Sequence, residues 1–246
     1  MSGHSKWSTI KRKKGKEDAR RAKIFTKLIR EISSAARLGG GDPNGNPRLR
    51  NAVLAAKAAN MPAENIKRAI QKGTGELPGT SYEEVTYEGY GPGGVAMMMQ
   101  VLTDNKNRTL PEIRHLFAKN AGNLGESGCV SWMFDKRGYI VVEKDKVDED
   151  ELMEIVLETG AEDMTEDGNN YEIFTSPESF ETVHNSLENH NIEIAAQEVA
   201  MVPKSTVKVT GKKAQQVLRM MEELEDHDDV QSVWANFNID ESEIEG

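Results

Sequence analysis

The residue types that most often support catalysis or metal binding are scattered along this chain. They are His4, His115, His184, His190, His227 and the single cysteine, Cys129. No two histidines have HExxH spacing, and the cysteine has no partner at CxxC spacing. No GxSxG motif occurs, so the sequence does not bring a nucleophile, a base and an oxyanion donor together. The sequence therefore predicts a protein that is not an enzyme and that binds neither a metal nor a cofactor.

One glycine motif matches the letters of a dinucleotide-binding fingerprint. Gly89, Gly91 and Gly94 have GxGxxG spacing. In a cofactor site this motif follows a strand and opens a helix, whose N-terminus meets the pyrophosphate. Here a run typical of a strand follows at 95–102, and Pro92 interrupts the motif. We therefore expect a turn between two strands and no cofactor loop.

An acidic run near the C-terminus has two interpretations. The residues 226–229 include His227 between aspartates, a combination that can hold a metal. At the C-terminal end of an expected helix at 212–225, the same run is more typical of a solvated turn. The neighbouring carboxylates also form a plausible face for a basic protein partner. These carboxylates are Glu222, Glu223, Glu225 and Asp226.

A polar loop at 104–109 leads into an expected helix from Leu110 to Ala121. Thr109 is expected to cap this helix and Pro111 to begin it. That arrangement leaves Arg108 free to contact RNA or protein. The structural and the functional interpretations of this loop both remain open.

Positive charge is concentrated at one end of the chain. Residues 1–75 hold 18 Lys and Arg against 5 Asp and Glu, whereas residues 76–246 hold 13 basic against 36 acidic residues. The net charge of −10 therefore conceals a strongly basic N-terminal region. This asymmetry predicts a polyanionic partner for that region alone, and such a surface gives affinity by releasing counterions from phosphates.

The candidate nucleic-acid contacts all come from this basic region. A solvated helix face is the alternative, but only three acidic residues interrupt the run up to Arg37. Trp7 is expected either to stack on an unpaired base or to pack on the protein. A membrane surface is a weaker candidate partner. The predicted contacts are Lys6, Trp7, Lys11, Arg12, Lys13, Lys14, Lys16, Arg20, Arg21, Lys23, Lys27, Arg30, Arg37, Arg48 and Arg50.

These cations are carried by an expected arm and a helical domain. Residues 1–16 are basic and nearly free of apolar side chains, which predicts disorder in the isolated chain. Residues 17–75 contain three stretches with apolar side chains at helical spacing, which predicts a three-helix bundle. The glycines at 39–41 end the first helix, Asn46 and Pro47 begin the second, and Gly73 closes the third.

The rest of the chain is expected to form two further α+β domains. Residues 138–200 read as β-α-β-β-α-β, the ferredoxin-like pattern, after a separate strand at 130–134. We expect a domain at 137–200 inserted into a split domain made of residues 76–136 and 201–246. Three consecutive small domains are the alternative. The predicted fold class is multidomain α+β.

The sequence also indicates the cellular compartment in which the protein acts. A single cysteine excludes an intramolecular disulfide, which fits a reducing compartment. No apolar run approaches the length of a membrane span, and the N-terminus has no hydrophobic signal core. A transit peptide is not favoured, because the basic stretch contains Glu17 and Asp18. We therefore expect a cytoplasmic protein.

Several specific motifs resemble the YebC family, whose mitochondrial members include a translational activator of cytochrome oxidase. The resemblance covers nearly the whole chain. Two positions depart from the family pattern: Ala121 stands where glycine is usual, and Cys129 where serine is usual. The motifs are Gly3–Trp7, Ile24–Ile32, Gly39–Pro43, Asn46–Arg50, Tyr87–Gly94, Thr103–Thr109, Asn123–Gly125 and Trp132–Phe134.

The resemblance implies three domains, no catalysis and two competing functions. In one, the basic domain binds DNA in a transcriptional regulator, and we expect its acidic domains to bind regulators or polymerase. In the other, the same domain binds ribosomal RNA and eases translation of proline-rich stretches. A basic arm fits recognition of phosphates and shape better than base-specific reading, which usually needs an exposed recognition helix.

Overall fold

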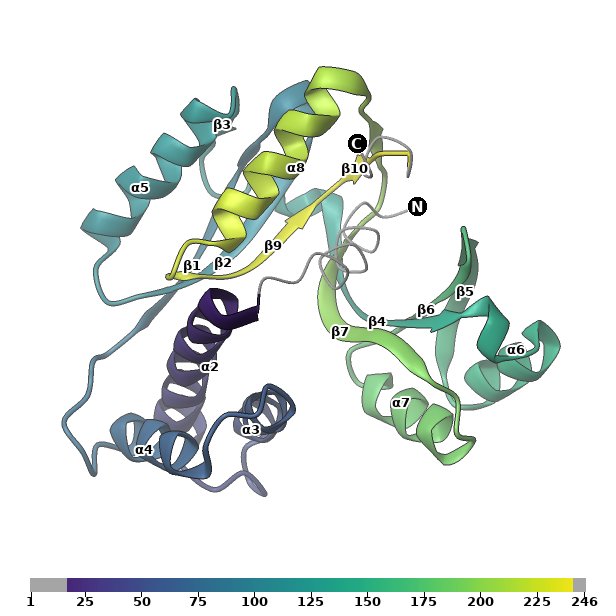
Figure 1. Ribbon diagram of the computed structural model, residues 1–246, viewed down its shortest axis with the longest axis horizontal. Coiled ribbons are helices and arrows are strands. Elements are labelled where there is room, and N and C mark those ends of the chain that lie inside the picture. The colour runs from purple at the N-terminus through teal and green to yellow at the C-terminus, as the bar shows by residue number, and fades with distance from the viewer. Residues whose placement is uncertain (1–16, 241–246) are drawn as a thin grey trace. The chain divides into compact units, whose positions relative to one another are not determined.

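The computed structural model describes residues 17–240, with side chains from Arg21 onward (Figure 1). Three helices come first among these residues, and helices and strands are interspersed from Glu83 onward. Antiparallel strand pairs occur in both four-stranded sheets. The described residues form two compact units, one with residues 17–129 and 211–233 and one with residues 130–210 and 234–240. The predicted multidomain α+β fold class is therefore confirmed. None of the described helices is long and apolar enough to cross a bilayer.

Three helices at the start of the first unit pack on one apolar core. They are α2 (Glu17–Gly39), α3 (Pro47–Ala58) and α4 (Ala63–Thr74). Each helix contributes one buried stripe, represented by Ile32, Leu49 and Ile66. Burial of such stripes, more than helix propensity, stabilises helices of this length.

Asn46 begins α3 as predicted. Its Oδ1 accepts a hydrogen bond from the backbone N–H of Leu49 at 3.1 Å, and Pro47 is the first helical residue. Its Nδ2 donates to the carbonyls of Ala35 and Gly40, at 2.8 and 2.9 Å. One buried side chain therefore caps the start of α3 and satisfies carbonyls at the end of α2.

Gly73 allows α4 to pack closely against α2 and does not end the helix. A Cβ added at Gly73 would lie 2.7 Å from the Cβ of Ala36, so α2 and α4 approach too closely for any side chain there. The prediction that Gly73 closes the helix is wrong. The helix continues to Thr74 and ends at Gly75, whose φ of 84° is the left-handed conformation that favours glycine.

A four-stranded sheet and two helices complete the first unit. The strand order is β3-β1-β2-β9, so β9 joins a sheet whose other strands lie more than 100 residues earlier in the chain. Helices α5 and α8 contact each other (Figure 1). They bury side chains such as Phe117 and Met221. The bounds are β1 (Glu83–Tyr90), β2 (Ala96–Thr103), α5 (Lys106–Lys119), β3 (Asn123–Leu124), α8 (Gly211–Glu225) and β9 (Val230–Ala235).

The glycine motif forms the turn between β1 and β2, as predicted. A short 3-10 helix, η1 (Pro92–Gly94), joins the two strands. The N–H of Gly91 donates to the carbonyl of Val95 at 2.8 Å. Because Gly93 and Gly94 have φ values of 77° and 80°, this turn needs residues without a Cβ. The motif opens no α-helix and so lacks the geometry of a pyrophosphate site.

The second unit is an antiparallel sheet with the strand order β5-β6-β4-β7. Helices α6 and α7 both pack on one face of it, around Ile140, Leu152 and Val183. A short parallel pair, β8 with β10, lies outside this sheet. The bounds are η2 (Ser131–Met133), β4 (Phe134–Glu143), η3 (Lys144–Lys146), α6 (Glu149–Glu158), β5 (Ala161–Asp167), β6 (Asn170–Thr175), α7 (Phe180–Asn189), β7 (Ile194–Pro203), β8 (Val207–Lys208) and β10 (Phe237–Asn238).

Strand β4 differs from its prediction. Two strands were expected, at 130–134 and from Gly138, but one strand runs from Phe134 to Glu143. The glycine lies inside the strand because a Cβ there would come within 2.7 Å of the ring of Phe180. It therefore marks a close approach of α7 and not the start of a strand.

Candidate nucleic-acid interface

The predicted contacts fall into three groups in the structure. The first group lies outside the described residues, and its side chains have no structural account. Arg20 lies on α2, but its side chain is not described. The other members are Lys6, Trp7, Lys11, Arg12, Lys13, Lys14 and Lys16.

The second group of cations is held by acidic and carbonyl oxygens within the protein. Lys23 Nζ lies 3.2 Å from a carboxylate oxygen of Asp226, and Lys27 Nζ donates to the carbonyl of Glu225 at 2.6 Å. Both oxygens lie at the C-terminal end of α8, where the helix dipole is negative. These two lysines therefore contact the end of α8 and are less available to an external phosphate.

Asp229 is the centre of a buried ionic cluster, which we call the Asp229 cluster and which also contains Arg30, Arg108 and Thr109. The side chain of Asp229 is only 2% exposed. Arg30 Nη1 pairs with one of its carboxylate oxygens, and Arg108 Nη2 lies 2.8 Å from the other. The hydroxyl of Thr109 also donates to that second oxygen. The cluster joins α2, α5 and the turn before β9.

The charge state of Asp229 follows from these partners. Burial by itself would raise the pKa of a carboxyl group. The hydrogen bonds from Thr109, Arg108 and Arg30 outweigh burial and lower the pKa of Asp229 to about 2. The same carboxylate, with Asp104, raises the pKa of Arg108. At neutral pH Asp229 is therefore ionised.

The start of α5 corrects the prediction for the polar loop. Asn105 caps the helix, its side chain accepting from the N–H of Arg108 at 3.2 Å, and the helix begins at Lys106. Thr109 is therefore not the cap, and Pro111 lies inside the helix. Arg108 is not free either, since it pairs with Asp104 and Asp229. Its side chain remains 43% exposed, so an outward contact is still compatible with this geometry.

Arg48 joins the helices to the sheet. Its Nε and Nη2 bind the two carboxylate oxygens of Glu31 at 2.7 and 3.0 Å, and its Nη1 lies 2.9 Å from Glu84 on β1. The hydrogen bond to Glu31 is the main reason that the pKa of Arg48 is raised. This bidentate geometry favours a fixed structural role for a guanidinium.

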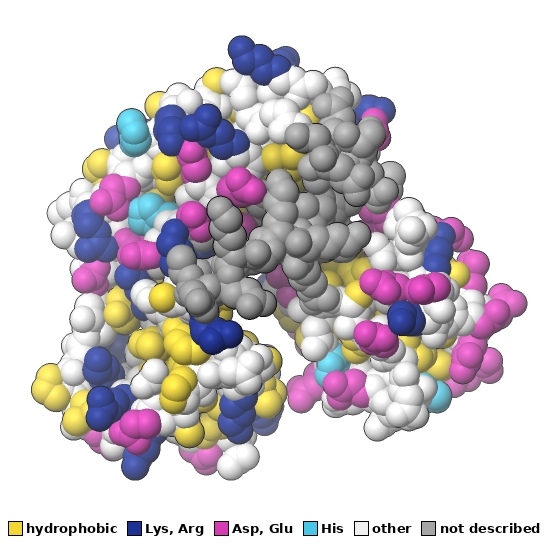
Figure 2. Space-filling view, viewed as in Figure 1, with side chains coloured by type: hydrophobic (Ala, Val, Ile, Leu, Met, Phe, Trp, Pro, Cys, Tyr) yellow, Lys and Arg dark blue, Asp and Glu magenta, His cyan; other side chains and the backbone are white. Residues whose placement is uncertain are grey.

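The third group of cations has no ion-pair partner among the described residues. Of the predicted contacts it contains Arg21, Arg37 and Arg50. Three lysines of α3 and α4 share this property but were not among the predicted contacts: Lys57, Lys67 and Lys72. Figure 2 shows several Lys and Arg side chains over the helices α2 to α4. The structure thus separates cations that hold the fold from these six cations, of which Arg50 is half-buried and the other five are exposed.

The sequence gives a weak indication that Lys57, Lys67 and Lys72 are exposed. Each lies between the apolar positions of its helix, where solvent exposure is expected. By contrast, Arg68 on the same surface is paired with Glu64 at 3.1 Å, an i,i+4 spacing that the sequence does show. The helical period indicates their exposure, but isolated lysines do not form a basic run.

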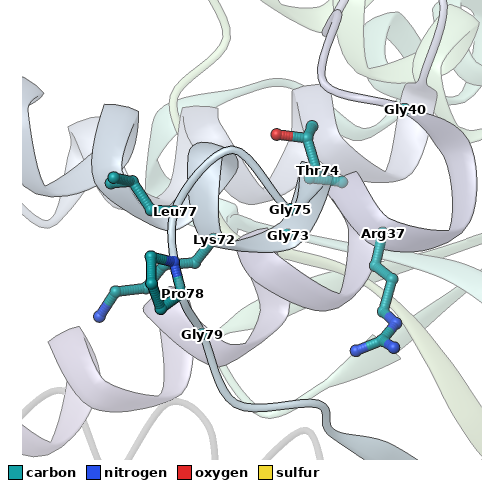
Figure 3. Close-up of a pocket in the computed structure, with 10 residues that line it drawn as sticks. Arg37, Gly40, Lys72, Gly73, Thr74, Gly75, Leu77, Pro78 and Gly79 are labelled. Atoms are coloured by element: carbon teal, nitrogen blue, oxygen red, sulfur yellow. The ribbon is translucent and has the colours of Figure 1, made fainter.

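A cavity of about 670 Å³ opens where α2 and α4 end. Its lining includes Arg37, Lys72, Leu77 and the backbone of Gly73 to Gly75. In Figure 3 the charged ends of Arg37 and Lys72 point in different directions and do not converge on the cavity. Both residues lie in the last turns of their helices, where cations stabilise the free carbonyls. The cavity therefore lacks a focused anion site.

The groups with metal-binding potential are engaged elsewhere. Within residues 17–240 no three His, Cys, Asp or Glu side chains are arranged to hold a metal ion. In the acidic turn, His227 Nε2 lies 3.1 Å from Glu112, and Asp226 pairs with Lys23. Burial raises the pKa of Cys129, as does the charge of Glu88, so its thiol is not activated as a nucleophile.

Comparisons with known proteins define the class to which this architecture belongs. Residues 5–76 match the family described as "TACO1/YebC protein N-terminal domain", and residues 82–237 match "TACO1/YebC second and third domain". The chain belongs to the TACO1/YebC family. The predicted membership of the YebC family is thus confirmed.

Individual relatives agree over the full length of the chain. A protein of Syntrophus aciditrophicus named "Probable transcriptional regulatory protein" is 58% identical over 246 residues, covering 100% of this chain and 98% of its own. A protein of the same name from Syntrophobacter fumaroxidans is 59% identical over 240 residues, covering 97% and 96%. The crystal structure of a conserved hypothetical protein from Aquifex aeolicus is 52% identical, with a TM-score of 0.80 and coverage of 91% and 93%.

Ala121 has a backbone conformation that favours glycine. It lies between α5 and β3 with a φ of 59°, in the left-handed region. Its N–H donates to the carbonyl of Ala118 at 3.2 Å, which closes the end of the helix. Alanine accepts this conformation at a cost of about 1 kcal/mol relative to glycine.

Proposed function

We propose that this chain is a non-enzymatic regulator of gene expression that binds nucleic acid in the cytoplasm through its basic N-terminal region. The observation that carries the proposal is a set of cations on α2, α3 and α4 that have no acidic partner within the part of the chain that the structure describes; all but the half-buried Arg50 are exposed. It is continuous in sequence with residues 1–16, which hold six cations and no acidic residue. The names of the relatives support a role in transcription.

The exposed side chains favour contact with phosphates over reading of bases. The outward face of α3 presents Asn51, Leu54 and Ala55 beside Arg50 and Lys57. Such a face has few groups that could form bidentate hydrogen bonds with base edges. Isolated exposed cations instead position a protein on the backbone without selecting a sequence. We therefore propose binding that depends on charge and shape.

Removal of one cation of this set at a time tests this mode of binding. Arg37→Ala, Arg50→Ala and Lys57→Ala are each expected to weaken binding to two unrelated duplexes by similar factors. Each should lower the slope of log K against log salt by about one unit, because one phosphate contact is lost. Fluorescence titrations at four salt concentrations measure both quantities.

Lys212→Ala provides the matched control, since it removes one exposed cation from α8. Its slope should equal that of the unchanged protein. A variant of Arg37, Arg50 or Lys57 that loses affinity for only one duplex would show base-specific reading and would contradict the proposed mode.

The competing function, an RNA-binding factor that eases translation of proline-rich stretches on the ribosome, uses the same surface. The scarcity of base-reading groups on α3 is equally compatible with structured RNA. Sedimentation of the endogenous protein through a gradient, with and without nuclease, separates the two. Comigration with ribosomal subunits that survives DNase would favour translation over transcription.

We also propose the finer organisation of the fold: a three-helix bundle at 17–75, a split domain at 76–136 and 201–246, and a ferredoxin-like domain inserted at 137–200. The succession β4-α6-β5-β6-α7-β7 supports the ferredoxin-like assignment. The pairing of Lys136 with Met201 supports an insertion, because the ends of the inserted segment then lie side by side.

Excision of the inserted segment tests this organisation. Replacing residues 137–200 with a short Gly/Ser turn should leave one cooperative unfolding transition in the remaining chain. The strands that remain at 134–136 and 201–203 are already paired and need only a tight connection. Circular dichroism during urea unfolding measures the transition. Loss of cooperativity would show that the segment is part of the same folding unit.

A further inference from the structure

The cavity at the ends of α2 and α4 is bounded largely by backbone and by apolar side chains. Four of its lining residues are glycines, Ala36, Leu77 and Pro78 also line it, and none of the lining residues is acidic. A Cβ added at Gly40 or Gly75 would meet no described atom within 4 Å, so the space beside their backbone is open. The volume of about 670 Å³ lies in the range of roughly 300–1,000 Å³ that is usual for sites of small ligands.

The walls of this cavity are fixed by close packing. Helices α2 and α4 approach each other at Gly73, as described above. The loop after α4 folds back on the helix, because the N–H of Leu77 donates to the carbonyl of Gln71 at 3.1 Å. A Cβ added at Gly79 would lie only 2.8 Å from the Cβ of Lys72, so this part of the loop also touches α4. A ligand would therefore enter a formed cavity and would not have to order it.

The charges divide this cavity into a neutral centre and a cationic rim. It lies at the C-terminal ends of two helices, where the dipole is negative and the carbonyls of the last turn have no partner inside the helix. These groups favour a neutral ligand that donates hydrogen bonds, and they disfavour a phosphate. Arg37 and Lys72 are exposed, and their charged ends point in different directions (Figure 3). Two such cations suit two phosphates on either side of a neutral group.

We propose that the cavity receives one unpaired base of a nucleic-acid strand, while Arg37 and Lys72 contact the phosphates on its two sides. This inference rests on the proposed function and deepens it. An unpaired base presents the N–H donors of its pairing edge to the helix-end carbonyls, and its face contacts Leu77 and Pro78. In a duplex the same edge is occupied and the base is stacked. The cavity therefore selects an unpaired nucleotide and not a sequence.

A hairpin with one bulged 2-aminopurine tests whether a base enters the cavity. The control is a hairpin of the same length in which the 2-aminopurine is paired, and both are made as DNA and as RNA to show which strand is preferred. The unchanged protein should bind the bulged hairpin about fivefold more tightly. The fluorescence of its 2-aminopurine should rise as the base leaves its stacked neighbours, and quenching by acrylamide should fall. Unchanged fluorescence with equal affinities for the two hairpins would overturn the proposal.

Leu77→Ala assigns the effect to the cavity. Leu77 is 37% exposed, so the change removes apolar contact with the base and should leave the fold intact. The preference for the bulged hairpin should fall from about fivefold to about twofold or less, with unchanged affinity for the paired hairpin. Leu54→Ala is the matched control, because Leu54 is 57% exposed on α3 and does not line the cavity. An equal loss of preference in both variants, or none in the Leu77 variant, would refute the assignment.

The same titrations separate this proposal from the proposed function. Salt-dependent binding of both hairpins with equal affinity and unchanged fluorescence would support the proposed function and refute the base-binding cavity. Absence of binding to either hairpin would refute both. Adenosine monophosphate distinguishes a free nucleotide from a strand, since it offers one phosphate to the two cations. It should compete with the bulged hairpin only weakly, and competition at equal concentration would show that the cavity takes a free nucleotide instead.

Discussion

Replacing Asp229 with asparagine is expected to lower the free energy of unfolding of the first unit by about 3 kcal/mol. Breaking a buried ion pair by removing one partner leaves the other charge uncompensated. Arg30, whose side chain is 14% exposed, would lose its carboxylate. The loss at Arg108 is smaller, because its side chain is 43% exposed and keeps Asp104. Urea unfolding followed by circular dichroism measures the change.

Asp228 offers a control one residue away. It is exposed, and only its backbone carbonyl contacts Arg30, at 2.6 Å. Asp228→Asn removes the same charge and should change the unfolding midpoint very little. Equal midpoints for the two variants would mean that the Asp229 cluster contributes nothing to stability.

The pH dependence of unfolding provides a second readout of the same carboxylate. The pKa of Asp229 is about 2 in the folded protein against an ordinary value of 3.8. Because the folded value is depressed, its stabilisation is complete above pH 3.8 and is lost as the pH falls towards 2. Asp229→Asn should remove this part of the acid sensitivity. The part due to Glu223, whose hydrogen bonds with Lys119 and others lower its pKa to about 2, should remain.

The sequence predicted local features of the fold well, because their causes lie within a few residues. Asn46 and Pro47 begin a helix wherever they occur together ahead of an apolar stripe, and the glycine motif requires a turn. The error at α5 has a local cause too. A proline in the first turns of a helix resembles a start signal, but Asn105 had already capped the helix six residues earlier.

The sequence could not show which cations are paired within the protein and which are available to a partner. Arg30 and Asp229 are 199 residues apart, and Arg48 reaches both Glu31 and Glu84. Such pairs depend on how the elements pack, and no helical or strand period records them. A basic run therefore predicts total charge, whereas the structure shows which of those charges remain available to a partner.

Deleting residues 1–16 is expected to cause the largest loss of nucleic-acid affinity. The segment holds six cations and no acidic residue, so the salt slope should fall by about five units if each cation contacts a phosphate. At roughly 0.1 M salt this corresponds to at least a hundredfold weaker binding. The apolar core of α2 to α4 contains none of these residues, so the unfolding curve should be unchanged.

Two further variants separate the contributions of charge and stacking within this segment. A full-length protein with the order of residues 8–16 scrambled keeps every charge and should bind as before, since phosphate contacts do not depend on local order. Trp7→Ala should cost about 1–3 kcal/mol for single-stranded nucleic acid if the indole stacks on a base, and nothing for duplex DNA. A folded truncation that binds with unchanged affinity would contradict the assignment of this segment. The contacts would then have to come from the exposed cations of α2, α3 and α4 alone.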